Sequence, residues 1–249
     1  MIYNDFSLCV KNCIKSLRGY KMRKRGFTLA EVLITLGIIG VVAAMTIPTL
    51  MLNIKAAKLK SQFRKAHSTL LQAYRLMLAD EVSTDPRDYT DSITFYRTYI
   101  RYFKGATYCG ASVNSSTVKS VLPCYNTSDR KGYKTLNTKV KAYEGRFDDG
   151  QIALPDGSLI LIENYGRRLW VSVDINGYNN KPNIWGVDLF TFEVLDSGLT
   201  AMGSRESTYN DTDKYCNKNK TDESNGIACA KKAIDDPDYF KKVVKDLKL

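Results

Sequence analysis

Histidine is almost absent from this sequence: His67 is the only one in 249 residues. Histidine is the commonest general base and metal ligand near neutral pH, so its scarcity argues against chemistry that needs several of them. The sequence also has no phosphate-binding glycine loop, no nucleophile motif and no histidine spacing typical of a metal site. Basic and polar residues surround His67, which predicts a solvent-facing side chain. These absences favour a protein that is not an enzyme.

Charge is absent from one long stretch, with a single exception. Between Phe27 and Leu52, Glu31 is the only charged residue. An apolar run of this length can cross a bilayer core about 30 Å thick as a helix. An acidic group inside such a span costs roughly 2.5–3.5 kcal/mol at the bilayer centre, so its presence indicates a function. A basic tract and then Gly26 directly precede the run: Arg23, Lys24 and Arg25.

The stretch from Arg23 to about Lys55 resembles the type IV prepilin signature, which type IV pilins share with the pseudopilins of type II secretion. The resemblance implies that a prepilin peptidase cuts between Gly26 and Phe27 and methylates the new amino terminus. It implies that Glu31 pairs with the amino terminus of a neighbouring subunit during assembly. It also places a helix-bending proline at Pro48.

Helix chemistry alone also accounts for some of these residues. Thr28 and Glu31 have the spacing of a capping box, in which each side chain satisfies a free N–H group of the first helical turn. A carboxylate in the first turn also meets the positive end of the helix dipole. Pro48 kinks a helix in any protein, because proline removes a backbone hydrogen bond. Capping does not explain the basic tract and the glycine before it.

A secretory signal peptide is the main alternative for the N-terminus. Such signals have an apolar core of about 7–15 residues and a cleavage site after that core. Here the apolar run is longer and the expected cut precedes it, so the run is retained. Residues 1–26 carry +6 of the total charge of +11, which predicts a cytoplasmic N-terminus and an exported C-terminal domain. A leader of this length is long for the family, and Met22 is an alternative start.

The six cysteines fall into two groups. Cys9 and Cys13 lie in the predicted cytoplasmic leader, where disulfides are rare. Four others lie in the exported part and allow three pairings: Cys109, Cys124, Cys216 and Cys229. Proximity in sequence favours Cys109 with Cys124 and Cys216 with Cys229. Each loop closure is worth about 3 kcal/mol in the chain-entropy model. Four reduced cysteines around a metal fit an exported protein poorly.

Apolar residues at spacings of three and four continue beyond the membrane-spanning run and predict one helix from about Thr28 to Asp80. The stripe consists of Leu52, Ala56, Leu59, Phe63, Ala66, Leu70, Ala73 and Met77. The expected organisation is a leader (1–26), a transmembrane and assembly helix (27–52), its amphipathic continuation (53–84) and an exported globular domain (85–249).

Within the globular part, the pattern predicts a short helix at 92–103, a stapled loop at 109–124 and a C-terminal helix within 225–249. It predicts strands at 151–154, 158–162, 169–173 and 189–194. A long N-terminal helix packed on a small antiparallel sheet of about four strands is an α+β fold, and this layout resembles the pilin fold.

One loop has the composition of a cation site. Asp174, Asn176 and Asp188 supply the oxygen ligands that calcium prefers. Some major pseudopilins hold calcium in a loop near the C-terminus, so the resemblance allows calcium here, although no cofactor is required. The pattern departs from an EF-hand, since it has no glutamate at position twelve. The alternative is a plain turn, because Asn176-Gly177 suits the positive φ angles of tight turns.

We therefore expect a structural subunit of a type IV pilus or a type II secretion pseudopilus, anchored once in a bacterial inner membrane before it enters a filament. Its expected partners are a prepilin peptidase, other pilins or pseudopilins, membrane lipid, a platform protein and an assembly ATPase. The alternatives are a membrane-tethered extracytoplasmic binding module and a DNA-uptake pilin. The sixteen tyrosines are better explained by core packing or subunit contacts than by DNA binding.

Overall fold

The computed structural model describes residues 26–89, 94–110, 123–125, 132–166 and 168–249. The leader before Gly26, with Cys9, Cys13 and Met22, lies outside the described residues, as does most of the predicted stapled loop. The chain divides into two compact units, Met1–Thr49 and Leu50–Leu249. The sheet and the core belong to the second unit, whereas the long helix begins in the first.

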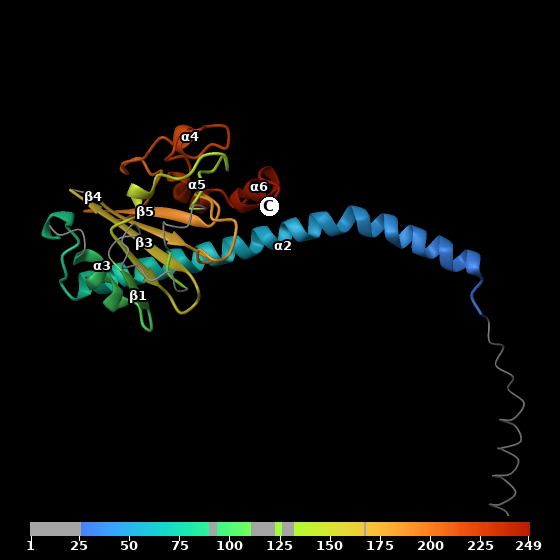
Figure 1. Cartoon of the computed structure of the whole chain (residues 1–249), viewed down its shortest axis with the longest axis horizontal. Coiled ribbons are helices and arrows are strands. Elements are labelled where there is room, and N and C mark those ends of the chain that lie inside the picture. The colour runs from blue at the N-terminus through green and yellow to red at the C-terminus, as the bar shows by residue number, and fades with distance from the viewer. Residues whose placement is uncertain (1–25, 90–93, 111–122, 126–131, 167) are drawn as a thin grey trace, which may run out of the picture. The chain divides into compact units, whose positions relative to one another are not determined.

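The long helix α2 (Leu29–Ala79) confirms the predicted helix and ends within one residue of each predicted boundary (Figure 1). A capping box begins it. The N–H of Thr28 donates to Oε2 of Glu31 at 2.8 Å, and the N–H of Glu31 donates to Oγ1 of Thr28 at 3.2 Å. At the other end, Glu81 has a φ of 56°, the left-handed conformation that commonly terminates helices.

Within the described residues the sheet has six strands, so the prediction of about four was wrong. The order in the sheet is the order in the chain, and every neighbouring pair is antiparallel: β1 (Thr107–Gly110), β2 (Gly150–Ala153), β3 (Leu159–Tyr165), β4 (Arg168–Asp174), β5 (Leu189–Leu195) and β6 (Gly198–Ala201). The four predicted strands are β2 to β5. The two missed strands are the edges, each four residues long and without a run of apolar residues. The α+β class is confirmed.

Short helices complete the globular unit. They are the 3₁₀ turns η1 (Pro86–Asp88), η2 (Ile100–Tyr102) and η3 (Glu144–Arg146), and the α-helices α3 (Thr94–Tyr99), α4 (Thr212–Tyr215), α5 (Cys229–Asp235) and α6 (Tyr239–Asp246). The helix predicted at 92–103 corresponds to α3 followed by η2. The helix predicted in the tail is α5, which begins at Cys229. A second helix, α6, was not predicted; Pro237 separates it from α5, because proline has no N–H to continue a helix.

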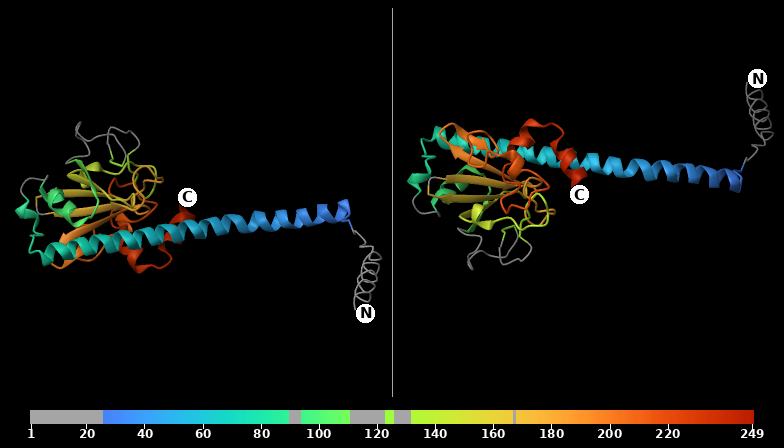
Figure 2. Two further views of the ribbon diagram at one scale, coloured as in Figure 1. Left: turned by 90° about the horizontal axis from the view of Figure 1, so that it is seen from below. Right: turned by 90° about the horizontal axis from the view of Figure 1, so that it is seen from above.

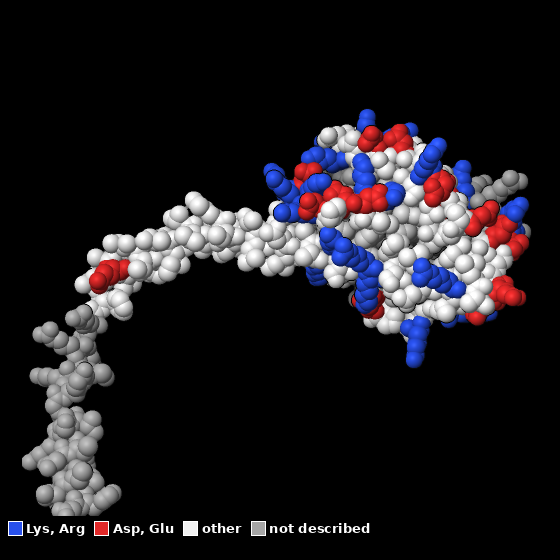
Figure 3. All heavy atoms as spheres, turned by 180° about the vertical axis from the view of Figure 1, so that it is seen from behind, with Lys and Arg blue, Asp and Glu red and all other residues white. Residues whose placement is uncertain are grey.

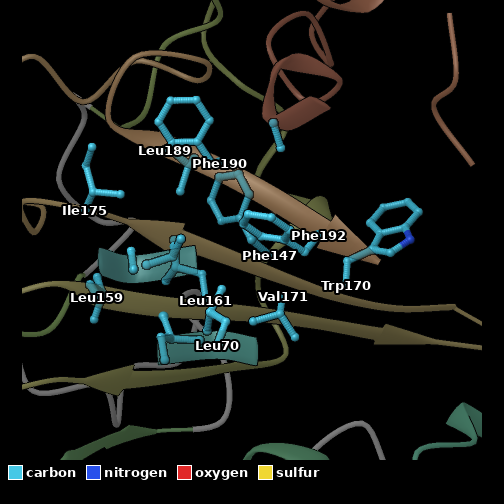
Figure 4. Close-up of a cluster of buried hydrophobic side chains, with 14 of the residues drawn as sticks. Leu70, Phe147, Leu159, Leu161, Trp170, Val171, Ile175, Leu189, Phe190 and Phe192 are labelled. Carbon is cyan, nitrogen blue, oxygen red and sulfur yellow. The ribbon is translucent and has the colours of Figure 1, made fainter. Parts of the chain in front are cut away.

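The buried stripe of α2 packs on one face of the sheet. Phe63 is the centre of this contact: its ring lies 4.5 Å from that of Phe190 on β5 and 5.5 Å from that of Phe240 on α6. Leu70 continues the same apolar layer toward the central strands (Figure 4). Since Phe63 and Leu70 are almost fully buried, this layer forms the core between helix and sheet.

Loops cover the opposite face of the sheet, as two further views show (Figure 2). Thr191, which alternates with the inward-facing phenylalanines of β5, bonds to Ser172 on β4 at 2.7 Å between hydroxyl oxygens. The indole N–H of Trp185 donates to Oγ1 of Thr191 at 2.9 Å. All three side chains are buried, so the sheet is buried on both faces at its centre.

The structure corrects the expectation for His67. Its ring is stacked on Phe192 at 5.0 Å between centroids and 7° between planes, and it also lies 6.1 Å from the ring of Phe63. His67 is therefore half-buried at the edge of the helix–sheet contact, and burial lowers its pKa. It follows Phe63 by four residues, which puts both rings on the same side of α2.

Candidate functional site

The first part of α2 has an unburied apolar surface. Leu33, Ile39 and Met45, on different sides of the helix, are each at least 60% exposed, and no residue from Gly26 to Lys55 is buried. Figure 3 shows this surface with one acidic group and otherwise uncharged residues. The helix is long and apolar enough to cross a membrane. Such a surface needs lipid or other protein around it.

Glu31 is the acidic group on that surface, and its contacts are local. Oε2 accepts hydrogen bonds from the N–H and the hydroxyl of Thr28, both at 2.8 Å. Among the described residues, no lysine or arginine forms an ion pair with Glu31. The helix N-terminus and its cap are thus the only compensation for this carboxylate in the described part of the chain.

Gly26 and Phe27 precede α2 in a non-helical segment. A Cβ added to Gly26 would meet nothing within 4 Å, and its φ lies outside the left-handed region. Neither packing nor backbone conformation within this chain therefore requires a glycine there. The Phe27 side chain is 87% exposed. A requirement for these two residues would have to come from a molecule that binds them.

Pro48 lies inside α2, where its ring leaves the carbonyl of Ala44 without the usual backbone donor. The boundary between the two compact units follows directly, after Thr49. The predicted bend at Pro48 stays a prediction.

Two disulfides join the cysteine pairs that proximity favoured, Cys109 with Cys124 and Cys216 with Cys229. The second connects the residue that follows α4 to the first residue of α5, and Cys229 is fully buried. Both links are consistent with an oxidising compartment.

The loop between β4 and β5 contains the predicted calcium ligands. Asp174 ends β4 and Asp188 precedes β5, and both side chains are fully buried. Asp174 accepts from the N–H of Gly177 at 2.8 Å and from the hydroxyl of Tyr133 at 2.7 Å. Asp188 accepts from the N–H of Asn183 at 2.8 Å. The two carboxylates therefore organise the loop backbone, and no local pattern indicated the contribution of Tyr133.

Burial raises the pKa of Asp174 to about 7, against the hydrogen bonds that favour its charged form. Burial, reinforced by the charge of Asp174, raises the pKa of Asp188 well above its ordinary value. In the same loop, the side-chain oxygens of Asn176 and Asn183 are buried without a hydrogen-bond partner. A buried oxygen without a hydrogen-bond partner is a candidate cation ligand, so the loop contains oxygen atoms of the kind that calcium prefers.

A match to a known protein family covers the N-terminal part of the chain. The family model described as the prokaryotic N-terminal methylation motif matches residues 21–47. No curated protein and no solved structure matches the chain. Residues 21–47, with the apolar helix that they begin, therefore form the signature of type IV pilins and pseudopilins and support a subunit of that kind.

Proposed function

We propose that this chain is a structural subunit of a type IV pilus or of a type II secretion pseudopilus. One combination of features supports the proposal: the methylation motif at residues 21–47 contains the start of an exposed apolar helix, and Glu31 is the only charged residue between Phe27 and Leu52. Type IV pilins and pseudopilins are structural subunits, not enzymes. The motif and the helix fit a precursor that is anchored by a single pass in the inner membrane.

In the first step, a prepilin peptidase cuts between Gly26 and Phe27 and methylates the new amine. Gly26 lies in a non-helical segment with free space around it, which suits the entry of a chain into a protease site. Removal of residues 1–26 takes away the +6 charge of the leader and leaves the apolar helix in place.

In the second step, Glu31 of one subunit pairs with the amine of Phe27 on another. An unpaired carboxylate in the bilayer is costly, and a cation from a neighbour compensates it. The amine would lie only one residue before Thr28, whose N–H already contacts Glu31. Cleavage thus brings a cation and a carboxylate to the same end of every subunit, where pairing between copies becomes possible.

In the third step, the apolar helices leave the lipid and bundle in the filament core. The exposed face of α2 supplies the surface that other copies cover. A platform protein and an assembly ATPase provide the work of extraction. The filament lies outside the inner membrane, and the globular unit faces outward.

The test of the Glu31 role compares Glu31→Leu with Thr28→Val. Both variants break the capping box, whereas only the first removes the charge. We expect both to be processed, Thr28→Val to assemble and Glu31→Leu to leave processed subunits in the membrane. Filament yield by electron microscopy and by shearing gives the readout. Wild-type yield from Glu31→Leu, or equal failure of both variants, contradicts a charge-pairing role.

The test of processing uses Gly26→Ser. Because a Cβ at this position meets nothing in the chain, the substitution leaves the fold unchanged. We expect an uncut precursor on a gel, while mass spectrometry of the wild type finds N-methylated Phe27 as the first residue. A mature wild-type protein that begins after Leu52 would exclude an assembly helix. Neighbouring genes for a peptidase, an assembly ATPase and a platform protein favour a filament over a tethered binding module.

We also propose that the β4–β5 loop binds calcium through Asp174, Asn176 and Asp188. The unpartnered oxygen of Asn176 supports this proposal, and that of Asn183 adds a fourth ligand from the same loop. Calorimetric titration of the chelator-treated protein tests it. A wild-type titration without heat, combined with an unchanged melting temperature, would refute it.

A further inference from the structure

The positive charge of the globular unit is concentrated on two segments, one in α2 and one at the C-terminus. Residues 53–65 contain five Lys or Arg and no acid, and residues 229–249 contain six Lys and four Asp. Counted by side chains, the two segments together carry +7, whereas residues 27–249 as a whole carry +5. The remainder of that part of the chain is therefore slightly acidic.

Two contacts bring the basic segments side by side. Nζ of Lys60 on α2 donates to the carbonyl oxygen of Pro237, shortly before α6, at 2.6 Å. The rings of Phe63 on α2 and Phe240 on α6 lie 5.5 Å apart. Figure 1 and Figure 2 both show α6 and the C-terminus beside α2, at the end of the globular unit where that helix enters it. Both basic segments thus lie at this end.

Four of the lysines in these segments are exposed and have no ion pair within the described residues. Lys55 and Lys58 are three residues apart on α2, and Lys241 and Lys245 are four apart on α6, so each pair lies on one side of its helix. Three of the four acids of the tail form ion pairs with other lysines, and Asp238 is the fourth. The charge of the four lysines is therefore largely uncompensated within the chain.

The uncharged run before these residues indicates what compensates them. It ends at Leu52, shortly before Lys55 and Lys58. At 1.5 Å per helical residue, the two lysines follow its end by about 5 and 9 Å. The polar headgroup layer on each side of a bilayer is about 5–8 Å thick. When the run fills the hydrocarbon core, Lys55 and Lys58 therefore lie at the level of the headgroups, and the end of the globular unit that carries α6 is the end nearest to them.

We propose that Lys55, Lys58, Lys241 and Lys245 bind the anionic headgroups of phospholipids and hold the globular unit on the bilayer surface before assembly. The inference rests on the membrane anchor of the proposed function. Clusters of basic residues next to a membrane span attract anionic lipids, and here those lipids supply the negative charge that the chain itself lacks. Because such contacts are electrostatic and salt weakens them, they release the subunit when it enters a filament.

The experiment measures how fast individual lysines of the full-length protein in lipid nanodiscs are acylated by a succinimidyl ester, with mass spectrometry as the readout. One set of discs contains only phosphatidylcholine, and the other also contains phosphatidylglycerol. Lysines held by phosphate react slowly, because the reagent needs a free neutral amine. We expect all four to react about fivefold more slowly in the anionic discs, the factor that corresponds to roughly 1 kcal/mol for each basic residue at an anionic surface. Salt at about 1 M, where the Debye length is only about 3 Å, should remove most of the difference.

Lys104 is the matched control within the same molecule. It is exposed and has no ion pair within the described residues. It lines a cavity with Gln72 of α2, which is about 20 Å along that helix from Lys58. We expect Lys104 to react at the same rate in both kinds of disc.

Lys241 and Lys245 decide the outcome, because Lys55 and Lys58 lie close to the headgroups in any protein anchored through this helix. In the double variant Lys55→Gln and Lys58→Gln, we expect Lys241 and Lys245 to lose part of their protection, whereas Lys104→Gln should leave it unchanged. The proposal is overturned if Lys241 and Lys245 react equally fast in both kinds of disc. It is also overturned if they are protected equally in both and the protection grows with the number of subunits per disc, since a second copy then covers this surface. Protein that does not enter the discs at all contradicts the membrane anchor as well.

Discussion

Phe63→Ala tests whether α2 is held on the sheet by an aromatic contact. The side chain is 2% exposed and contacts rings from two other elements, Phe190 on β5 and Phe240 on α6. Truncation of a buried phenylalanine to alanine costs about 3–5 kcal/mol, through lost burial and the cavity that remains. Since the cavity walls belong to three separate elements, they cannot close around it easily. We therefore expect a loss in the upper half of that range.

The assay is urea and thermal unfolding of residues 53–249 as a soluble fragment, with the disulfides kept oxidised. Near-ultraviolet circular dichroism follows the aromatic core. For a domain of this size, 3–5 kcal/mol corresponds to a decrease in melting temperature of about 6 to 20 °C. Phe63→Leu keeps most of the volume and should lose only about 1–2 kcal/mol. Leu78→Ala, on the same helix but 49% exposed, should change stability by less than about 0.5 kcal/mol.

The comparison between the two alanine variants decides the outcome. If Phe63→Ala loses no more than Leu78→Ala, then Phe63 does not anchor the helix and the packing described for it is wrong. If Phe63→Leu loses as much as Phe63→Ala, ring geometry matters more than buried volume.

Three further predictions concern other parts of the globular unit. Burial lowers the pKa of His67 in the folded protein, so the unfolded chain binds a proton at this residue more readily. The stability contributed by the neutral His67 is therefore complete above the unfolded pKa of about 6.5, and it is lost as the pH falls through the lower pKa of the folded state. His67→Gln should remove this part of the pH dependence. The measurement is the loss of unfolding free energy between pH 7.5 and 5 in the wild type and in the variant, and an equal loss in both would contradict the prediction. Replacing both Cys216 and Cys229 with serine should cost about 3 kcal/mol for a 13-residue separation, measured in urea without reductant; a loss below about 1 kcal/mol would show that the link is dispensable. Gly226 has a φ of +117°, and Gly226→Ala would place a Cβ 2.5 Å from Cβ of Trp185. We therefore expect unfolding free energy to fall by at least about 2 kcal/mol and tryptophan fluorescence to change. A variant that melts at the wild-type temperature would refute the clash.

Long periodic patterns in the sequence predicted their elements well. The capping box at Thr28 and the stripe that ends at Met77 predicted the two ends of α2 to within one residue, since a 3.6-residue repeat over many turns leaves little choice. Strands β3 to β5 were found because they are largely buried and rich in apolar and aromatic residues. The edge strands β1 and β6 were missed because they are short and get their order from hydrogen bonds to a neighbour, not from their own apolar residues.

The predicted site residues also belong to local sequence patterns, whereas the unpredicted ones depend on contacts between distant parts of the chain. Gly26, Phe27 and Glu31 form a local motif that a sequence displays directly. The bond from the Tyr133 hydroxyl to Asp174 joins residues that lie 41 positions apart, which no local pattern shows. One signal was available: Asp174 is an acid at the end of a mostly apolar strand, and buried acids require a partner.

The residues proposed for assembly and those that stabilise the fold do not overlap. No side chain from Gly26 to Lys55 is buried, whereas the buried stripe of α2 begins at Ala56. A substitution such as Glu31→Leu therefore removes no contact from the globular core, and residues 53–249 should melt at the same temperature whether the full chain assembles or not. Failure to assemble in that variant can then be assigned to the helix surface, because loss of the folded domain would appear separately in the melt.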